Sequence, residues 1–107
     1  MQLYVHNEMT EAIFGKPYEE IHIWLDDCYP DYAYNGKNAH YGSVHYHRIE
    51  RHNLQAIHEK YGKDTIESKV AILHCIVDFL SAYGEYYLPM NKEDCLFFLK
   101  TTYIANI

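Results

Sequence analysis

No long apolar run occurs in this chain of 107 residues. The most apolar segment, residues 70–80, is interrupted by His74 and Asp78, so it is unsuited to cross a bilayer. The first residues, MQLYVHNEMTEA, lack the basic start and the apolar stretch of a signal peptide. The sequence therefore predicts a protein with no membrane span and no standard route of secretion.

Cysteine is scarce and odd in number. Cys28, Cys75 and Cys95 lie far apart and form no C-x-x-C pair. A disulfide framework and a zinc knuckle both need paired cysteines at characteristic spacings, so neither is indicated. Unpaired thiols are typical of a reducing compartment, and we expect a cytoplasmic location.

Positive charge is also scarce, because nine Lys and Arg residues stand against fifteen Asp and Glu residues, for a formal net charge of −6. A surface with that balance repels a phosphate backbone unless its few cations cluster. General nucleic-acid binding is therefore not expected. Hydrophobic residues make up 49% of the chain and charged residues 22%, which excludes a disordered chain and predicts a globular one.

The periodic segments repeat near 3.6 residues and none alternates convincingly, which predicts helices without strands. We expect an all-α fold, a compact single-domain bundle of four to five helices over residues 1–107. Start and stop signals predict helices at 8–14, 17–28 and 39–61, a fourth that ends before Gly84, and a last one that opens near Asn91. Residues 29–38 have the composition of a loop.

Capping residues and apolar spacing predict further details. Asn7 is expected to cap the first helix, and Asp64 with Glu67 to form a capping box for the fourth. Asn91 with Asp94 can open the last helix. The apolar residues of the fourth helix recur at spacings of four and three, which predicts a buried stripe. Its members are Ile66, Val70, Leu73, Val77 and Leu80.

Two pairs of His and Asp share one geometry. His22 with Asp26 and His74 with Asp78 are four apart, which places each pair on one helical face. If the helices pack together, these side chains and two histidines of the third helix converge, which is how bundles build metal sites. Imidazole and carboxylate suit a divalent transition metal such as zinc, iron or manganese. The candidate metal ligands are His22, Asp26, His40, His47, His74 and Asp78. The alternative is a network of hydrogen bonds without metal.

Both arginines of the chain lie in the segment HYHRIERH, residues 45–52. Arg48 and Arg51 can clamp a phosphate or a carboxylate, because the guanidinium fork suits bidentate binding of oxyanions. His52 follows Arg48 by four residues and shares its helical face. Arg48, Arg51 and His52 are therefore the candidate catalytic residues. The alternative is that the arginines pair with acidic side chains and hold helices together.

The order of these motifs resembles a small family of uncharacterised domains found in bacteria and bacteriophages. Its pattern runs from a His and a Gly of a first helix through H-x-W-x-D, A-H-aromatic, H-R-x-x-R-H and H-x-x-x-D to a proline. The matching residues here are His6 and Gly15, His22 to Asp26, Ala39 to Tyr41, His47 to His52, and His74 with Asp78 before Pro89. The resemblance implies a phage or prophage origin, hence a host cytoplasm, and it carries no established activity.

Two functions from different classes fit this sequence. The first is a metal-binding α-helical domain that acts as a hydrolase on a small phosphorylated or otherwise anionic substrate, and it resembles helical His/Asp phosphohydrolases in ligand type though not in motif order. The second is a non-enzymatic, phage-encoded interaction protein that inhibits a host factor, with the His, Asp and Arg residues as a structural polar network. A homodimer is compatible with either.

Overall fold

The computed structural model describes residues 2–27 and 48–105, and every regular element among them is helical. The helices are α1 (Leu3–Phe14), α2 (Glu19–Asp26), α5 (Leu54–Tyr61), α6 (Ile66–Tyr83) and α7 (Lys92–Ala105). Residues 48–51, the first described after the gap, are helical and precede α5. The prediction of a compact all-α domain is confirmed. The loop expected at 29–38 lies outside the described residues.

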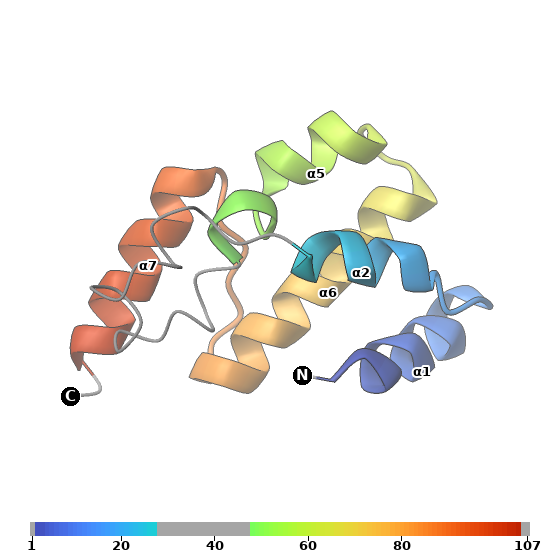
Figure 1. Cartoon of the computed structure of the whole chain (residues 1–107), viewed down its shortest axis with the longest axis horizontal. Coiled ribbons are helices and arrows are strands. Elements are labelled where there is room, and N and C mark those ends of the chain that lie inside the picture. The colour runs from blue at the N-terminus through green and yellow to red at the C-terminus, as the bar shows by residue number, and fades with distance from the viewer. Residues whose placement is uncertain (1, 28–47, 106–107) are drawn as a thin grey trace.

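The central helix is α6, which contacts α1, α2 and α5, while α7 lies at the opposite end of the molecule from α1 (Figure 1). Apolar side chains are buried in two clusters, and α6 contributes to both. The first cluster consists of Ile21, Leu25, Ile57, Val70, Ala71 and Cys75. The second consists of Ile49, Phe79, Cys95 and Leu99. None of the helices in the described part is long and apolar enough to cross a membrane.

The first helix begins earlier than predicted. Asn7 does not cap it but lies inside α1, and its side chain donates to Glu19 Oε1 over 3.2 Å. The helix extends back to Leu3 because His6, in its first turns, is buried against α6. Its end is as predicted, since Gly15 adopts φ 87° and donates its N–H to the carbonyl of Glu11.

The second helix is shorter than the predicted 17–28. Tyr18 has a left-handed backbone with φ 52°, so α2 begins at Glu19, and Pro17 lies outside it. The carbonyl oxygen of Pro17 accepts a hydrogen bond from the His22 ring instead of an intrahelical N–H. A side chain of α2 therefore fixes the residues that lead into the helix.

The prediction of one continuous helix over 39–61 is wrong in its described part. The chain leaves the helical conformation at His52 and Asn53, and Asn53 has extended angles of φ −151° and ψ 156°. The Asn53 Oδ1 atom accepts from Ala56 N–H over 2.8 Å and caps α5. Its Nδ2 atom donates to the carbonyl of Ile49 over 3.2 Å. One asparagine thus ends one helical segment and starts the next.

The fourth predicted helix has a different cap and a different buried face. Thr65, not Asp64, caps α6 by accepting from Ser68 N–H over 3.0 Å. Of the predicted stripe only Val70 is fully buried, and Ile66 is 51% exposed. The buried face is rotated toward Ala71, His74, Cys75, Asp78 and Phe79. The rotation occurs because His74 and Asp78 find polar partners inside the protein. The start of α7 is as predicted, since Asn91 Oδ1 accepts from Asp94 N–H over 3.0 Å.

Candidate metal centre

Two side chains of α6 form the base of a buried polar cluster. His74 and Asp78, one turn apart, are exposed by 1% and 2%, and they lie between the two apolar clusters. Both are held toward α1, α2 and the residues just before α5. A charged carboxylate buried to this degree requires partners, since an unpaired one is costly.

Four donor atoms from three segments of the chain converge at this cluster. They are Asp26 Oδ1 of α2, His52 Nε2 from before α5, and His74 Nε2 and Asp78 Oδ2 of α6. His52 Nε2 lies 3.0 Å from the Asp78 oxygen and 3.5 Å from the Asp26 oxygen. His74 Nε2 lies 3.2 Å and 3.3 Å from the same two oxygens.

These separations suit a single metal ion. Ligand atoms placed about 2.0–2.2 Å from one ion lie about 3.3–3.6 Å from each other in tetrahedral geometry, and neighbouring ligands lie about 2.8–3.1 Å apart in octahedral geometry. The rings of His52 and His74 are inclined by 66°, so both Nε2 atoms can point at one position. The four residues therefore form a group that could hold a metal ion.

The second oxygen of Asp78, Oδ1, is bound by a residue outside the group of four. His6 Nε2 of α1 donates to Asp78 Oδ1 over 3.0 Å, and Arg48 Nε lies 3.8 Å from Oδ2. Burial alone would raise the pKa of Asp78, but hydrogen bonds from His52, His6 and His74 outweigh it and hold the pKa below its usual range. Asp78 is therefore an ionised ligand oriented by His6.

His22 lies behind His74 and fixes its protonation. A carbonyl oxygen only accepts, so the 3.1 Å contact between His22 Nε2 and Pro17 O assigns the His22 proton to Nε2. Burial, helped by the proximity of His74 and His6, lowers the pKa of His22 to about 4, so His22 is neutral and its Nδ1 is an acceptor. His74 Nδ1, 2.9 Å away, therefore donates its N–H to His22.

This assignment leaves the other ring nitrogen of His74 facing two carboxylate oxygens. A neutral His74 with its proton on Nδ1 presents a lone pair at Nε2, 3.2 Å and 3.3 Å from Asp78 and Asp26. Such a contact is repulsive unless a cation lies between the atoms. Without metal, a second proton on His74 supplies the positive charge. Burial lowers the pKa of His74, but the hydrogen bonds with Asp26 and Asp78 raise it by more, so the net shift of the pKa is upward. The position thus favours a cation.

A second group of donors, His6, His22 and His74, is also close enough for a metal. Its rings are stacked, with interplanar angles of 14° to 23° and with the His6 and His74 centroids 3.8 Å apart. Ring lone pairs lie in the ring plane, so nearly parallel rings cannot all direct theirs at one ion. The group of Asp26, His52, His74 and Asp78 is the better site.

The structure brings together three of the six predicted ligands, Asp26, His74 and Asp78. His22 is adjacent but bonds to His74 and Pro17. The predicted ligands His40 and His47 lie outside the described residues.

The three predicted catalytic residues have separate positions. His52 is among the four converging donors, where burial, partly offset by its hydrogen bond to Asp78, lowers its pKa to about 4 and keeps it neutral. Arg48 is near Asp78, and its NH1 group donates to the Tyr83 hydroxyl over 3.3 Å. Arg51 donates to the Trp24 carbonyl over 2.7 Å, and its guanidinium lies over the Trp24 ring. The role of each remains a prediction.

Sequence spacing alone did not identify two residues of α1 that belong to the polar cluster. His6 entered only through the family resemblance, and Thr10, whose hydroxyl lies 3.0 Å from His22 Nε2, was not considered. They are four residues apart, and both are buried. The same spacing that singled out the other pairs therefore also marked this one, with a hydroxyl in place of the carboxylate.

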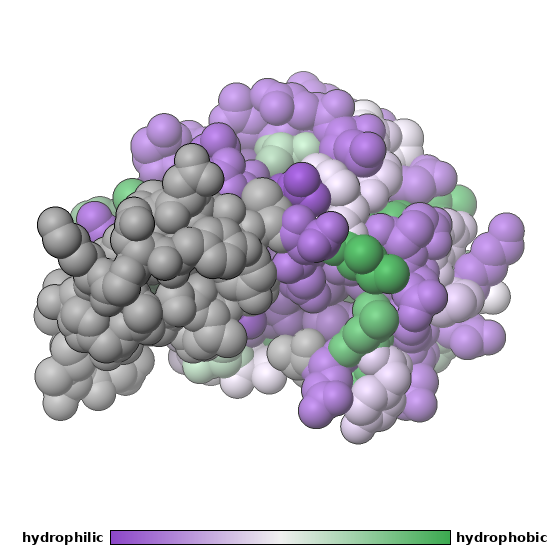
Figure 2. Space-filling view, in the orientation of Figure 1, coloured by the Kyte–Doolittle hydropathy of each residue, from purple (hydrophilic) through white to green (hydrophobic). Residues whose placement is uncertain are grey.

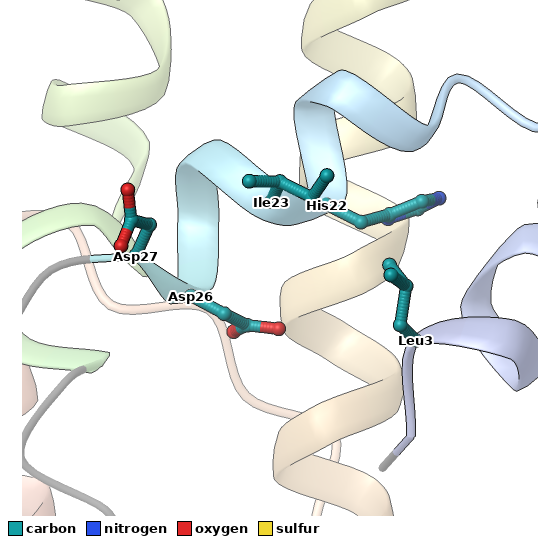
Figure 3. Close-up of a pocket in the computed structure, with 5 residues that line it drawn as sticks. All are labelled: Leu3, His22, Ile23, Asp26 and Asp27. Carbon is teal, nitrogen blue, oxygen red and sulfur yellow. The ribbon is translucent and has the colours of Figure 1, made fainter.

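The group has one side open to solvent. Of the four residues only Asp26 is substantially exposed, by 36% of its side chain. It lines a pocket of about 360 Å³ together with Leu3, His22, Ile23 and Asp27. In Figure 3 the Asp26 carboxylate points toward α6, while Leu3 points toward His22 from the start of α1.

Comparison with protein-family models, with curated proteins and with solved structures finds no match for this chain.

Proposed function

We propose that this protein binds one divalent transition metal ion through Asp26, His52, His74 and Asp78 and uses it in hydrolysis. The observation that carries the metal is the direction of His74. Its Nδ1–H is committed to His22, and its Nε2 faces two carboxylate oxygens at 3.2 Å and 3.3 Å. A metal ligand histidine commonly donates its second ring N–H to such a partner.

The types of ligand narrow the choice of metal. Two imidazoles and two carboxylates suit zinc, iron or manganese. Four protein ligands fill a tetrahedral zinc site, which is the pattern of structural zinc, whereas six-coordinate iron or manganese keeps two positions open. A catalytic role therefore favours iron or manganese at this site.

Hydrolysis is supported by access from one side. The pocket reaches the group at Asp26, while His52, His74 and Asp78 are buried. Asp26, His52, His74 and Asp78 would hold the metal ion, which would supply the chemistry of activating water for attack near neutral pH. The chain itself keeps Asp78 ionised and His52 neutral. Burial of His52, His74 and Asp78 excludes water from the sides of the group away from the pocket.

Metal binding is tested with protein that carries no histidine tag. We expect metal analysis to find about one equivalent of metal per chain, and chelation to lower the melting temperature, because metal binding adds to folding stability. Asp26→Asn should bind metal more than about 100-fold more weakly. Its metal-free form should melt below the metal-free wild type, because Asp26 also bonds to His74, but its melting temperature should no longer rise when metal is added. Asp64→Asn, an exposed residue on the turn before α6, makes the same charge change and should keep the metal.

Two results would contradict the proposal. Wild-type protein that contains no metal, takes none up and melts identically with and without chelator would leave the cluster as the structural network of an interaction protein. Metal-loaded protein that hydrolyses none of a panel of chromogenic esters, amides and phosphates would reduce the role of the metal to structure.

A further inference from the structure

The pocket beside Asp26 limits what the proposed centre can act on. Resting on the proposed function, we infer that its substrate carries an apolar part and a positively charged polar end, and that it is not a phosphate. The inference comes from which side chains line the side of the group that is exposed among the described residues, and from where the two arginines lie.

Approach to the metal position is possible from one direction among the described residues. His52 and His74 have fully buried side chains, and Asp78 is 2% exposed. Asp26 is the one member that reaches the pocket. A molecule that contacts the metal must therefore lie against the other lining residues, which are Leu3, His22, Ile23 and Asp27.

The charge of this lining is negative. Asp27 is exposed and lies at the end of the pocket opposite Leu3 (Figure 3). The described lining includes neither Lys nor Arg. A divalent metal balances the carboxylates of Asp26 and Asp78, and the Arg48 guanidinium 3.8 Å from Asp78 is buried, whereas the charge of Asp27 is exposed in the pocket lining. A cationic end is favoured beside Asp27, and a phosphate meets no cationic side chain in the described lining.

Neither arginine that could have neutralised an oxyanion lines the pocket. Arg48 contacts Asp78 and Tyr83 and is itself buried. Arg51 is held by the carbonyl and the ring of Trp24. The prediction of a small anionic substrate depended on these two side chains, and neither lines the pocket.

The remaining lining offers apolar contact. Ile23 is 48% exposed and Leu3 is 38% exposed, although both lie next to the polar group. Figure 2 shows apolar surface between α1 and α2 amid hydrophilic residues. A hydrocarbon chain laid over these residues would be removed from water, which favours binding. The pocket therefore fits a chain that joins a metal-binding group to a cationic end.

The experiment uses cobalt(II)-loaded protein, whose metal content is measured first, and two six-carbon hydroxamates that differ in one end. The probes are 6-aminohexanohydroxamate and adipic monohydroxamate, and binding is followed by the cobalt absorption bands. We expect the amino probe to bind about fivefold more tightly than the carboxylate probe at low salt. Asp27→Asn should bring the ratio toward one, while Asp64→Asn should leave it unchanged. Inorganic phosphate at millimolar concentration should not change the spectrum.

The two proposals fail in different ways. Protein that takes up no cobalt refutes the metal centre and this inference with it. Cobalt-loaded protein that binds the carboxylate probe or phosphate as tightly as the amino probe refutes only the substrate class. A preference for the amino probe that persists in Asp27→Asn also refutes it, because another group would then be responsible.

Discussion

His22 acts on the proposed metal through His74 and does not itself bind it. Its Nε2–H is fixed by the carbonyl of Pro17, and its Nδ1 accepts from His74. The sequence placed His22 correctly next to Asp26 on one face of a helix, but spacing does not show which ring nitrogen faces which partner. That depends on a carbonyl five residues earlier.

Replacement of His22 by phenylalanine tests this orienting role. His22→Phe fills a similar volume but leaves the Nδ1–H of His74 without its acceptor, so we expect metal affinity to fall about 10- to 100-fold with all four ligands present. Competition with a chromophoric chelator measures the affinity. His58→Phe, on the partly exposed side of α5, is the matched control and should bind metal like the wild type. Equal affinities in both variants would show that His74 needs no orienting partner.

At the scale of elements, the ligand His52 lies where the helical residues 48–51 end, next to the Asn53 cap of α5. Asn53 supports this break with three side-chain hydrogen bonds, to Ala56 N–H and to the carbonyls of Ile49 and Glu50. The His52 N–H donates to the carbonyl of Arg48 over 2.8 Å, so the backbone that carries this ligand is fixed on one side by the helical residues and on the other by Asn53. The cap therefore has a role in the site as well as in stability.

Asn53→Ala is expected to cost more stability than Thr65→Ala. Loss of a helix cap typically costs about 1 kcal/mol, and the asparagine also leaves two carbonyls without its amide donor. We expect about 2 kcal/mol for Asn53→Ala and about 1 kcal/mol for Thr65→Ala in denaturant unfolding of metal-free protein. Only Asn53→Ala should also weaken metal binding, because only that cap adjoins a ligand. Weakened binding in both variants would mean that general destabilisation causes the loss.

Helix type and several helix ends were predictable because they depend on local chemistry. Gly15 and Asn91 act within one turn of where they lie in the sequence. The face of α6 was not predictable in the same way. Its apolar spacing indicated Ile66 and Leu80, but these are partly exposed, and the helix turns inward at His74 and Asp78. A polar residue can be buried when side chains far away in the sequence form hydrogen bonds with it. The hydrophobic pattern of one helix does not contain that information.

At the scale of the whole molecule, the polar centre lies where two apolar clusters meet. Ala71 and Cys75 of α6 belong to the first cluster and Phe79 to the second, with His74 and Asp78 between them. The first cluster includes α2 and α5, and the second includes α7. A metal ion held by the four residues would link α2 directly to α6 through Asp26, and none of these ligands lies on α7.

Hydrogen exchange should therefore respond to metal unevenly along the chain. Opening of α2 breaks a metal bond, so at a metal concentration about 100 times its Kd the amides of Glu19–Asp26 should exchange about 100-fold more slowly than in chelator. Amides of α7 that exchange by local opening should not change, because the buried side chains of α7 belong to the second cluster and none of the four ligands lies on α7. Mass spectrometry at temperatures well below the melting point resolves the two helices.

The Asp26→Asn variant distinguishes the two ways in which metal could slow exchange. If the slowing in α2 comes from the bond to Asp26, it should disappear in this variant even at metal concentrations that saturate the remaining ligands. Equal slowing of α2 and α7 in the wild type would show instead that the two clusters open as one cooperative unit. The polar centre would then stabilise the whole fold without marking a boundary within it.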